Sequence, residues 1–264
     1  MHRTVWASLI LFLAGAHGAA FAEEWNKTFA VSGRPELRID TNDGDVSVRT
    51  ADVKQIEARV STVGWKIGPS DVRVSDRQTG DRVELEVRIP RRHFNLDWGR
   101  RSVKIELQVP RETRSDIHTD DGNIAAEGLR GETRLHTRDG RIEANALDGA
   151  LEARSGDGRI NIRGRLDLLN VRTGDGSIEA EVAPGSKMAS SWRVESGDGH
   201  VRLRLPEGFA ADLDAHTGDG RITVDFPVTV SGTLGQSDVR GKMNGGGPTL
   251  SVRTGDGSIH LERL

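Results

Sequence analysis

Eight aspartates recur in one short sequence pattern and are the residues of this chain best suited to chemistry. Each lies in the string Ser/Thr-x-Asp-Gly-x-(Ile/Val), at Asp43, Asp121, Asp139, Asp157, Asp175, Asp198, Asp219 and Asp256. Carboxylate oxygens repeated along a stack of turns could bind a row of hard cations such as Ca²⁺. Two carboxyl groups in unlike environments could instead act as acid and base in glycoside hydrolysis.

The seven aspartates from Asp121 to Asp256 are the candidate cation ladder. Coils of about 18 residues have the period of the calcium-binding nonapeptide rolls. Those rolls carry Gly-Gly-x-Gly-x-Asp at both turns of a coil, whereas this sequence has one Asp-Gly per coil. We therefore expect no cofactor, with calcium as the alternative.

The same carboxylates are poor candidates for a catalytic pair. They occur in repeated and equivalent surroundings, whereas an acid and a base need different environments to separate their pKa values. No Gly-x-Ser-x-Gly, His-Glu-x-x-His or P-loop string occurs in the sequence. We predict that the protein is not an enzyme, and a polysaccharide lyase or hydrolase built on a β-helix is the alternative.

A row of mostly basic side chains is the first candidate binding site. If the repeats stack, one outward position of each repeat carries His118, His136, Arg154, Arg172, Glu195, His216 and Arg253. Arginine pairs with carboxylate and phosphate in bidentate fashion, so the basic members could hold an acidic glycan or a lipid head group. The alternative is a solvated strand face whose charges deter edge pairing. The imidazoles have no third ligand in phase, so we expect no metal site.

An excursion between two alternating stretches is the second candidate. It contains Arg91, Arg92, Trp98, Arg100 and Arg101, residue types that dominate binding hot spots. An exposed hairpin tip without a function explains the segment as well. The expected partner is an envelope component, an acidic glycan or another protein. We expect no nucleic acid, because 37 basic residues against 40 acidic ones leave no positive excess. We expect no membrane span, because no stretch beyond residue 22 is long and apolar enough.

Alternation with period two on both sides of each Asp-Gly predicts the elements that carry these residues. Leu169-x-Val171 precedes the motif at Asp175, Ile178-x-Ala180 follows it, and the other copies are similar. Such alternation is typical of strands with one buried face. No stretch beyond residue 22 has a sustained helical period, so we predict an all-β fold.

The spacing of the motif favours a solenoid. The four copies from Asp121 to Asp175 are 18 residues apart, and equal intervals keep the same phase of turn and apolar residues, as stacking of like on like requires. We predict a β-helix-like stack of two-strand repeats, with an antiparallel β-sandwich or meander as the alternative. The second turn of a repeat is expected near sites such as Asp148-Gly149 or Arg163-Gly164.

A backbone argument accounts for the Asp-Gly pair. Glycine accepts a positive φ without steric cost, and aspartate can fold its carboxylate onto nearby N–H groups. The preceding Ser or Thr is in phase with the buried face and can bind turn amides. Stacking would bring successive carboxylates to about 4.8 Å, and arginines such as Arg138, Arg141 and Arg159 could offset their repulsion.

The first 22 residues predict export. Arg3 supplies a positive charge, residues 5–16 are an apolar run too short to span a membrane, and residues 20–22 form a small-x-small cleavage site. The sequence contains no cysteine, which excludes disulfides and acylation on cysteine. We expect a signal peptide over residues 1–22 and a secreted protein in the periplasm or at the cell surface.

Residues 23–115 are strand-rich but less regular than the rest. We expect them to form an irregular β cap on the Asp-Gly repeat region of residues 116–264, continuous with it as one elongated domain. With 4% aromatic residues and 32 glycines, the core must be thin and built from Val, Ile, Leu and Ala.

The order of these units resembles a known family. The long alternating segment 103–110, followed by serial Thr-x-Asp-Gly-x-Ile and Ser-Gly-Asp-Gly-x-Ile units, is similar to bacterial β-strand-repeat proteins described as adhesins and as domain of unknown function 4097. The resemblance covers about residues 29–262. It implies an all-β, solenoid-like envelope protein without catalytic residues. We therefore predict an exported cell-envelope protein acting as a non-catalytic binding, adhesin-like or scaffold module.

Overall fold

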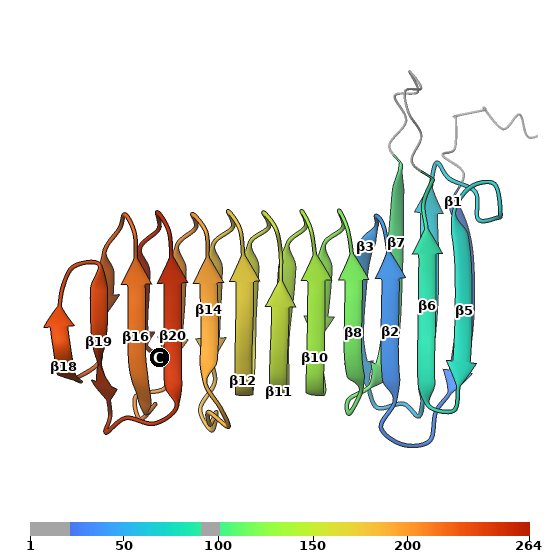
Figure 1. Cartoon of the computed structure of the whole chain (residues 1–264). Coiled ribbons are helices and arrows are strands. Elements are labelled where there is room, and N and C mark those ends of the chain that lie inside the picture. Colours follow the sequence, from blue (N-terminus) through green and yellow to red (C-terminus); the bar gives the residue numbers. More distant parts are fainter. Residues whose placement is uncertain (1–21, 91–100) are drawn as a thin grey trace, which may run out of the picture.

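The chain winds into a solenoid in which two β-faces lie back to back (Figure 1). The computed structural model describes residues 22–90 and 101–264. Its strands are β1 (Ala22–Ala30), β2 (Glu36–Thr41), β3 (Asp45–Ala51), β4 (Gln55–Val63), β5 (Arg73–Thr79), β6 (Arg82–Arg88), β7 (Ser102–Pro110), β8 (Arg114–Thr119), β9 (Ile124–Glu127), β10 (Arg130–Thr137), β11 (Ile142–Arg154), β12 (Ile160–Thr173), β13 (Ile178–Val182), β14 (Trp192–Ser196), β15 (Val201–Leu205), β16 (Ala211–Thr217), β17 (Ile222–Val224), β18 (Val228–Leu234), β19 (Asp238–Met243), β20 (Thr249–Thr254) and β21 (Ile259–Arg263). None of the described segments is a helix long and apolar enough to cross a membrane.

One coil consists of two strands on opposite faces, joined by the Asp-Gly turn. β8 pairs in parallel with β2 and β10 on the front face, which faces the viewer in Figure 1, whereas β9 pairs in parallel with β3 and β11 on the back face. The register places Ile39, Ile117 and Leu135 side by side in the core. The predicted solenoid is confirmed. The hairpin alternative is wrong, because the strands that flank a motif pair with other coils.

β11 and β12 continue around the second corner of the coil without a break. Residues 142–145 of β11 pair with β9 on the back face, and residues 148–154 pair with β10 on the front face. The bend between these parts contains Ala146, a non-glycine residue with a φ of 52°, and the register with β12 shifts there. The turn expected near Asp148-Gly149 is therefore a bend within a strand.

The coils do not stack in chain order at either end of the solenoid. β20 pairs with both β14 and β16, and β21 pairs with both β15 and β17. The last coil of the chain therefore lies between two coils that precede it. At the other end, β2 and β3 lie between the β6–β7 pair and the β8–β9 coil (Figure 1).

Antiparallel strands form both ends of the stack. β4 pairs antiparallel with β1 and β7, and β5 pairs antiparallel with β6, which makes the irregular N-terminal cap. At the C-terminal end, β19 pairs antiparallel with β16 and β18. The β18–β19 hairpin was not expected from the sequence.

A ladder of buried hydroxyl groups connects the turns of neighbouring coils. Its members, in spatial order, are Thr119, Thr137, Ser155, Thr173, Ser196, Thr254 and Thr217. Thr137 Oγ1 donates to the Gly122 carbonyl of the previous coil at 2.9 Å and accepts from the Gly140 N–H of its own coil at 3.0 Å. This hydroxyl ladder confirms that the motif Ser or Thr binds a turn amide, and it also joins each coil to the next.

The motif glycines are required by close approach between coils. Of the eight, only Gly44 has a left-handed φ, of 109°. At each of the other seven, an added Cβ would overlap the carbonyl oxygen of the motif glycine in the neighbouring coil, as at Gly158 against Gly140. The predicted reason, a positive φ, was therefore wrong for these seven. The carboxylate folds back as expected at Asp43, which accepts from the Gly44 N–H at 2.6 Å.

The core between the two faces is a thin apolar layer of mainly Ile, Val, Leu and Ala side chains. Trp192 is its largest fully buried side chain, and its ring lies 5.3 Å from that of Phe209. The buried Ser115 hydroxyl has no hydrogen-bond partner among the described residues. Burying an unbonded hydroxyl costs free energy.

Gly158→Ala should destabilise the protein by about 2 kcal/mol or more, because overpacking against backbone cannot be relieved by moving a side chain. Gly208→Ala is the matched control, since an added Cβ there meets no atom within 4 Å. Urea unfolding followed by circular dichroism measures both. Equal unfolding midpoints for the two variants would contradict the close-approach account.

Thr137→Val should lower the free energy of unfolding by about 1–3 kcal/mol, because it keeps the shape of the side chain but leaves a buried N–H and carbonyl unpaired. Thr137→Ser retains the hydroxyl and should recover most of this loss. Ser115→Ala removes an unpartnered hydroxyl and should leave stability unchanged or higher. Thermal unfolding of the three variants checks the order, and a Thr137→Val protein as stable as Thr137→Ser would argue against the hydroxyl ladder.

Candidate functional site

Four basic side chains lie side by side on the front face. His118 on β8 is in register with His136 on β10, which is in register with Arg154 on β11 and then Arg172 on β12. We call these four residues the basic row. Its orientation follows from the period-two pattern, because the neighbouring positions Ile117, Leu135, Ala153 and Val171 all point into the core.

Acidic residues end the basic row on both sides. Asp40 on β2 is in register with His118, and Glu195 on β14 is in register with Arg172. Beyond Glu195 the order is Arg253 and then His216, the reverse of their order in the sequence, because β20 lies between β14 and β16. The four-residue row is thus separated from the other basic residues at this position.

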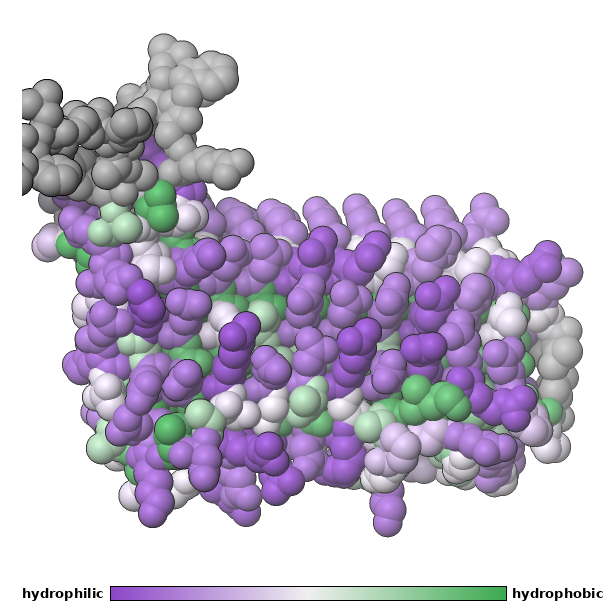
Figure 2. All heavy atoms as spheres, turned by 180° about the vertical axis from the view of Figure 1, so that it is seen from behind, coloured by the Kyte–Doolittle hydropathy of each residue, from purple (hydrophilic) through white to green (hydrophobic). Residues whose placement is uncertain are grey.

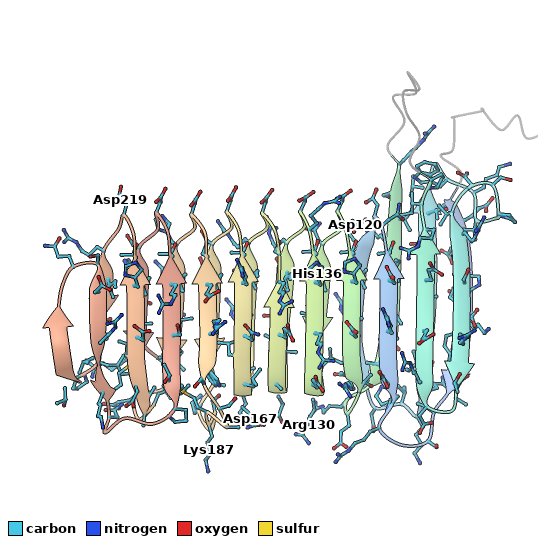
Figure 3. All side chains as sticks on the ribbon, viewed as in Figure 1. Asp120, Arg130, His136, Asp167, Lys187 and Asp219 are labelled. Carbon is cyan, nitrogen blue, oxygen red and sulfur yellow. The ribbon has the colours of Figure 1, made fainter. Side chains whose placement is uncertain are left out.

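The two histidines of the basic row are stacked on each other. Their ring centroids are 4.8 Å apart with an interplanar angle of 20°, and His118 Nε2 lies 3.5 Å from Asp120 Oδ1. Burial, followed by the charges of His118 and Arg154, lowers the pKa of His136 below its ordinary value, although Asp120 and Asp116 oppose the shift. Figure 3 shows His136 on the front face, below Asp120 at the turn edge.

The two arginines differ in their partners. Arg154 donates to Glu152 at 2.7 Å, two residues away on the same strand. Arg172 is exposed, and no carboxylate of the described chain is within ion-pair distance of it. The guanidinium of Arg172 therefore has its donors free for a ligand.

The rows of side chains on either side of the basic row carry either equal numbers of acidic and basic groups or an excess of acidic groups. Two residues earlier on each strand stand Asp116, Arg134, Glu152 and Asn170, and Arg134 pairs with Glu152 at 3.7 Å. On the other side lies the turn edge with its aspartates. The basic row is consequently a cationic stripe that is one side chain wide.

All eight motif aspartates lie exposed along the edge formed by the stacked turns (Figure 3). Backbone bonds hold adjacent turns together, for example from the Asp175 N–H to the Gly156 carbonyl at 3.2 Å. Arg138 bridges Asp121 and Asp139, as expected for an arginine that offsets their repulsion. Among the described residues, no three His, Asp or Glu side chains are arranged to hold a metal ion.

The second sequence candidate falls largely outside the described residues. Arg91, Arg92, Trp98 and Arg100 belong to residues 91–100, which the structure does not describe. Arg101 is described, and its guanidinium lies 5.0 Å from the centroid of the Trp65 ring. That contact lies between residues next to the end of β4 and the start of β7, whereas the basic row is on β8, β10, β11 and β12.

A chain of ion pairs at the second corner was not anticipated. Arg165 donates to Asp148 and, at 2.6 and 2.9 Å, to both oxygens of Asp167, while Arg130 donates to Asp148 at 2.9 Å. Arg130 and Asp167 mark this lower edge in Figure 3. Burial alone would raise the pKa of Asp148, but the hydrogen bonds and charges of Arg165 and Arg130 outweigh it and lower that pKa. This cluster joins three successive coils.

The back face has shallow hollows of mixed charge. One of about 390 Å³ is bordered by Glu143, Asn161, Glu179 and Arg202, with acids and bases on adjacent strands. Figure 2 shows this face covered mainly by hydrophilic side chains. Among the described residues the one large hydrophobic side chain that is exposed is Leu264.

Comparison with known proteins gives one family match over most of the chain. The family model Toastrack DUF4097 matches residues 36–262, and no curated protein matches. The solved structures include a proposed cell adhesion protein from Clostridium sporogenes, at 15% identity, with 92% of this chain and 100% of that chain covered and a TM-score of 0.46. A proposed adhesin from Parabacteroides merdae has 9% identity, coverages of 92% and 96% and a TM-score of 0.44.

Asp148→Asn should cost about 1 kcal/mol of stability at pH 7, since the amide cannot replace a charge-assisted pair. A carboxyl whose pKa is lower in the folded than in the unfolded state stabilises the fold above the unfolded value of about 3.9. The difference from the parent protein should therefore shrink as the pH falls below that value. Urea unfolding from pH 7 to pH 3 measures it, with Asp225→Asn as an exposed control, and a pH-independent difference would count against the ion-pair account.

Proposed function

This chain belongs to the Toastrack DUF4097 family, and we propose that it is an exported, non-catalytic binding module of the cell envelope. The observation that carries the proposal is the register of the front face. Coils stacked in register repeat the same outward position along the solenoid, so chosen side chains form straight rows on a continuous surface. Such a surface suits a long, repetitive ligand better than a small molecule in a cleft.

The arrangement of carboxylates supports binding over catalysis. The eight motif aspartates occupy equivalent exposed positions at one edge, whereas an acid and base pair for glycan cleavage needs unlike environments. The rows of the front face carry their charges on strands, where paired neighbours hold them in place. Binding therefore needs no rearrangement of the scaffold.

Export rests on the sequence of the first residues. A charged start, an apolar run and a small-x-small site over residues 1–22 are typical of a secretory signal. A fold without cysteine is suited to an oxidising compartment, because it has no thiol to be oxidised or mispaired.

Fractionation of the producing cells tests the proposal. We expect the protein in the periplasmic or surface fraction, with Glu23 as the first residue by N-terminal sequencing. The purified mature protein should also co-sediment with insoluble envelope polymers from the same cells, with bovine serum albumin as the control for trapping. Cytosolic protein that retains residues 1–22, or a mature protein that stays in the supernatant, would refute this function.

A further inference from the structure

We propose that the basic row binds a single chain of an acidic polysaccharide, lying across the strands along the solenoid axis. The inference rests on the proposed binding function and names its ligand class. The site consists of His118, His136, Arg154 and Arg172, one from each of four successive strands. These four basic side chains follow one another on adjacent strands with no other residue between them.

The spacing of the row matches such a chain. Neighbouring strands lie about 4.8 Å apart, and the two imidazole centroids are 4.8 Å apart. That distance is close to the length that one sugar ring adds to an extended glycan. A uronic acid polymer therefore presents its carboxylates at intervals that the row can meet. Arg172 is free to take one carboxylate through two N–H donors.

The surroundings of the row favour a narrow ligand. Asp116 and Glu152 lie on one side with Arg134 between them, and Asp120 and the turn aspartates lie on the other, where Arg138 bridges Asp121 and Asp139. A flat anionic membrane or a nucleic acid duplex would cover these acids as well as the row and be repelled by them. A single glycan chain is narrow enough to cover the basic row without covering the acids beside it. The described surface also has no cluster of exposed large hydrophobic side chains that could insert into a lipid layer.

The stacked histidines make binding stronger in acid. Two protonated imidazoles at this distance repel each other, and Arg154 beside His136 adds to the repulsion, while Asp116, Asp120 and Asp40 oppose it. A bound carboxylate chain would offset the repulsion, so protonation and binding must favour each other. The row carries two charges when both histidines are neutral and four when both are protonated.

Isothermal titration calorimetry with oligogalacturonate of defined length tests the inference, at low ionic strength and at pH 7.5 and 5.5. The mature parent protein should bind more tightly at pH 5.5. Arg154→Gln/Arg172→Gln should weaken binding about fivefold or more at pH 7.5. His118→Gln/His136→Gln should retain binding at pH 7.5 but lose the gain at pH 5.5. Arg163→Gln/Arg202→Gln on the back face removes the same charge and should bind like the parent, and circular dichroism verifies that each variant is folded.

Three results would overturn the inference. The first is equal loss of binding in the back-face control, which would reveal a general charge effect. The second is equal binding of neutral dextran oligomers. The third is tighter, row-dependent binding to phosphatidylglycerol vesicles than to the glycan, which would make a lipid surface the ligand. If the protein does not bind oligogalacturonate but still co-sediments with envelope polymers, this inference is wrong, whereas the proposed function holds with a different ligand.

Discussion

The hydrogen bond from a buried Ser or Thr hydroxyl to the glycine carbonyl of the neighbouring coil is the interaction on which this structure depends. It requires the two turns to approach until no Cβ fits between them, so the hydroxyl and the glycine are needed together. The same hydroxyl accepts the N–H of its own turn, as Thr137 does from Gly140, so a buried backbone donor is satisfied there. The Asp-Gly motif is therefore a device for stacking turns, and its aspartate is the part left to face solvent.

The hydrogen bonds between turns set the register of the strands, and this register determines which side chains lie next to each other on the surface. Once the turns are aligned, each residue that precedes a turn lies beside its equivalent in the next coil, inward and outward positions alternating. The core then fills with layers of like residues such as Ile117 and Leu135, and the outer face fills with rows of charge. The basic row and the acidic edge are thus products of the same alignment, which explains why they run parallel and so close together.

Much of this could be predicted from the sequence, because every coil repeats the same local pattern. Equal spacing implied stacking, and phase placed His118, His136, Arg154 and Arg172 in one row. The prediction that the motif glycines are needed for a positive φ was wrong for seven of them, because they are needed for the close approach of neighbouring turns. The distance between two turns depends on tertiary structure and cannot be inferred from the sequence of a single turn. The Arg165 cluster was missed for a similar reason, because it depends on the bend at Ala146 and on three coils meeting at one corner.

The order in which the coils stack could not be predicted from the local sequence, for a different reason. The motifs at Asp219 and Asp256 are nearly identical, so nothing in either one says which of them should lie next to Ser196. Only the β18–β19 hairpin, which covers β16 from the outer side, leaves the inner position to β20.

That placement has a consequence for how the chain is made. β16 and β17 reach the rest of the stack only through β20 and β21, which follow them in the chain. β16 and β17 therefore cannot join the stack until β20 and β21 have been synthesised, and loss of β20 and β21 would open a gap inside the stack, between β14–β15 and β16–β17.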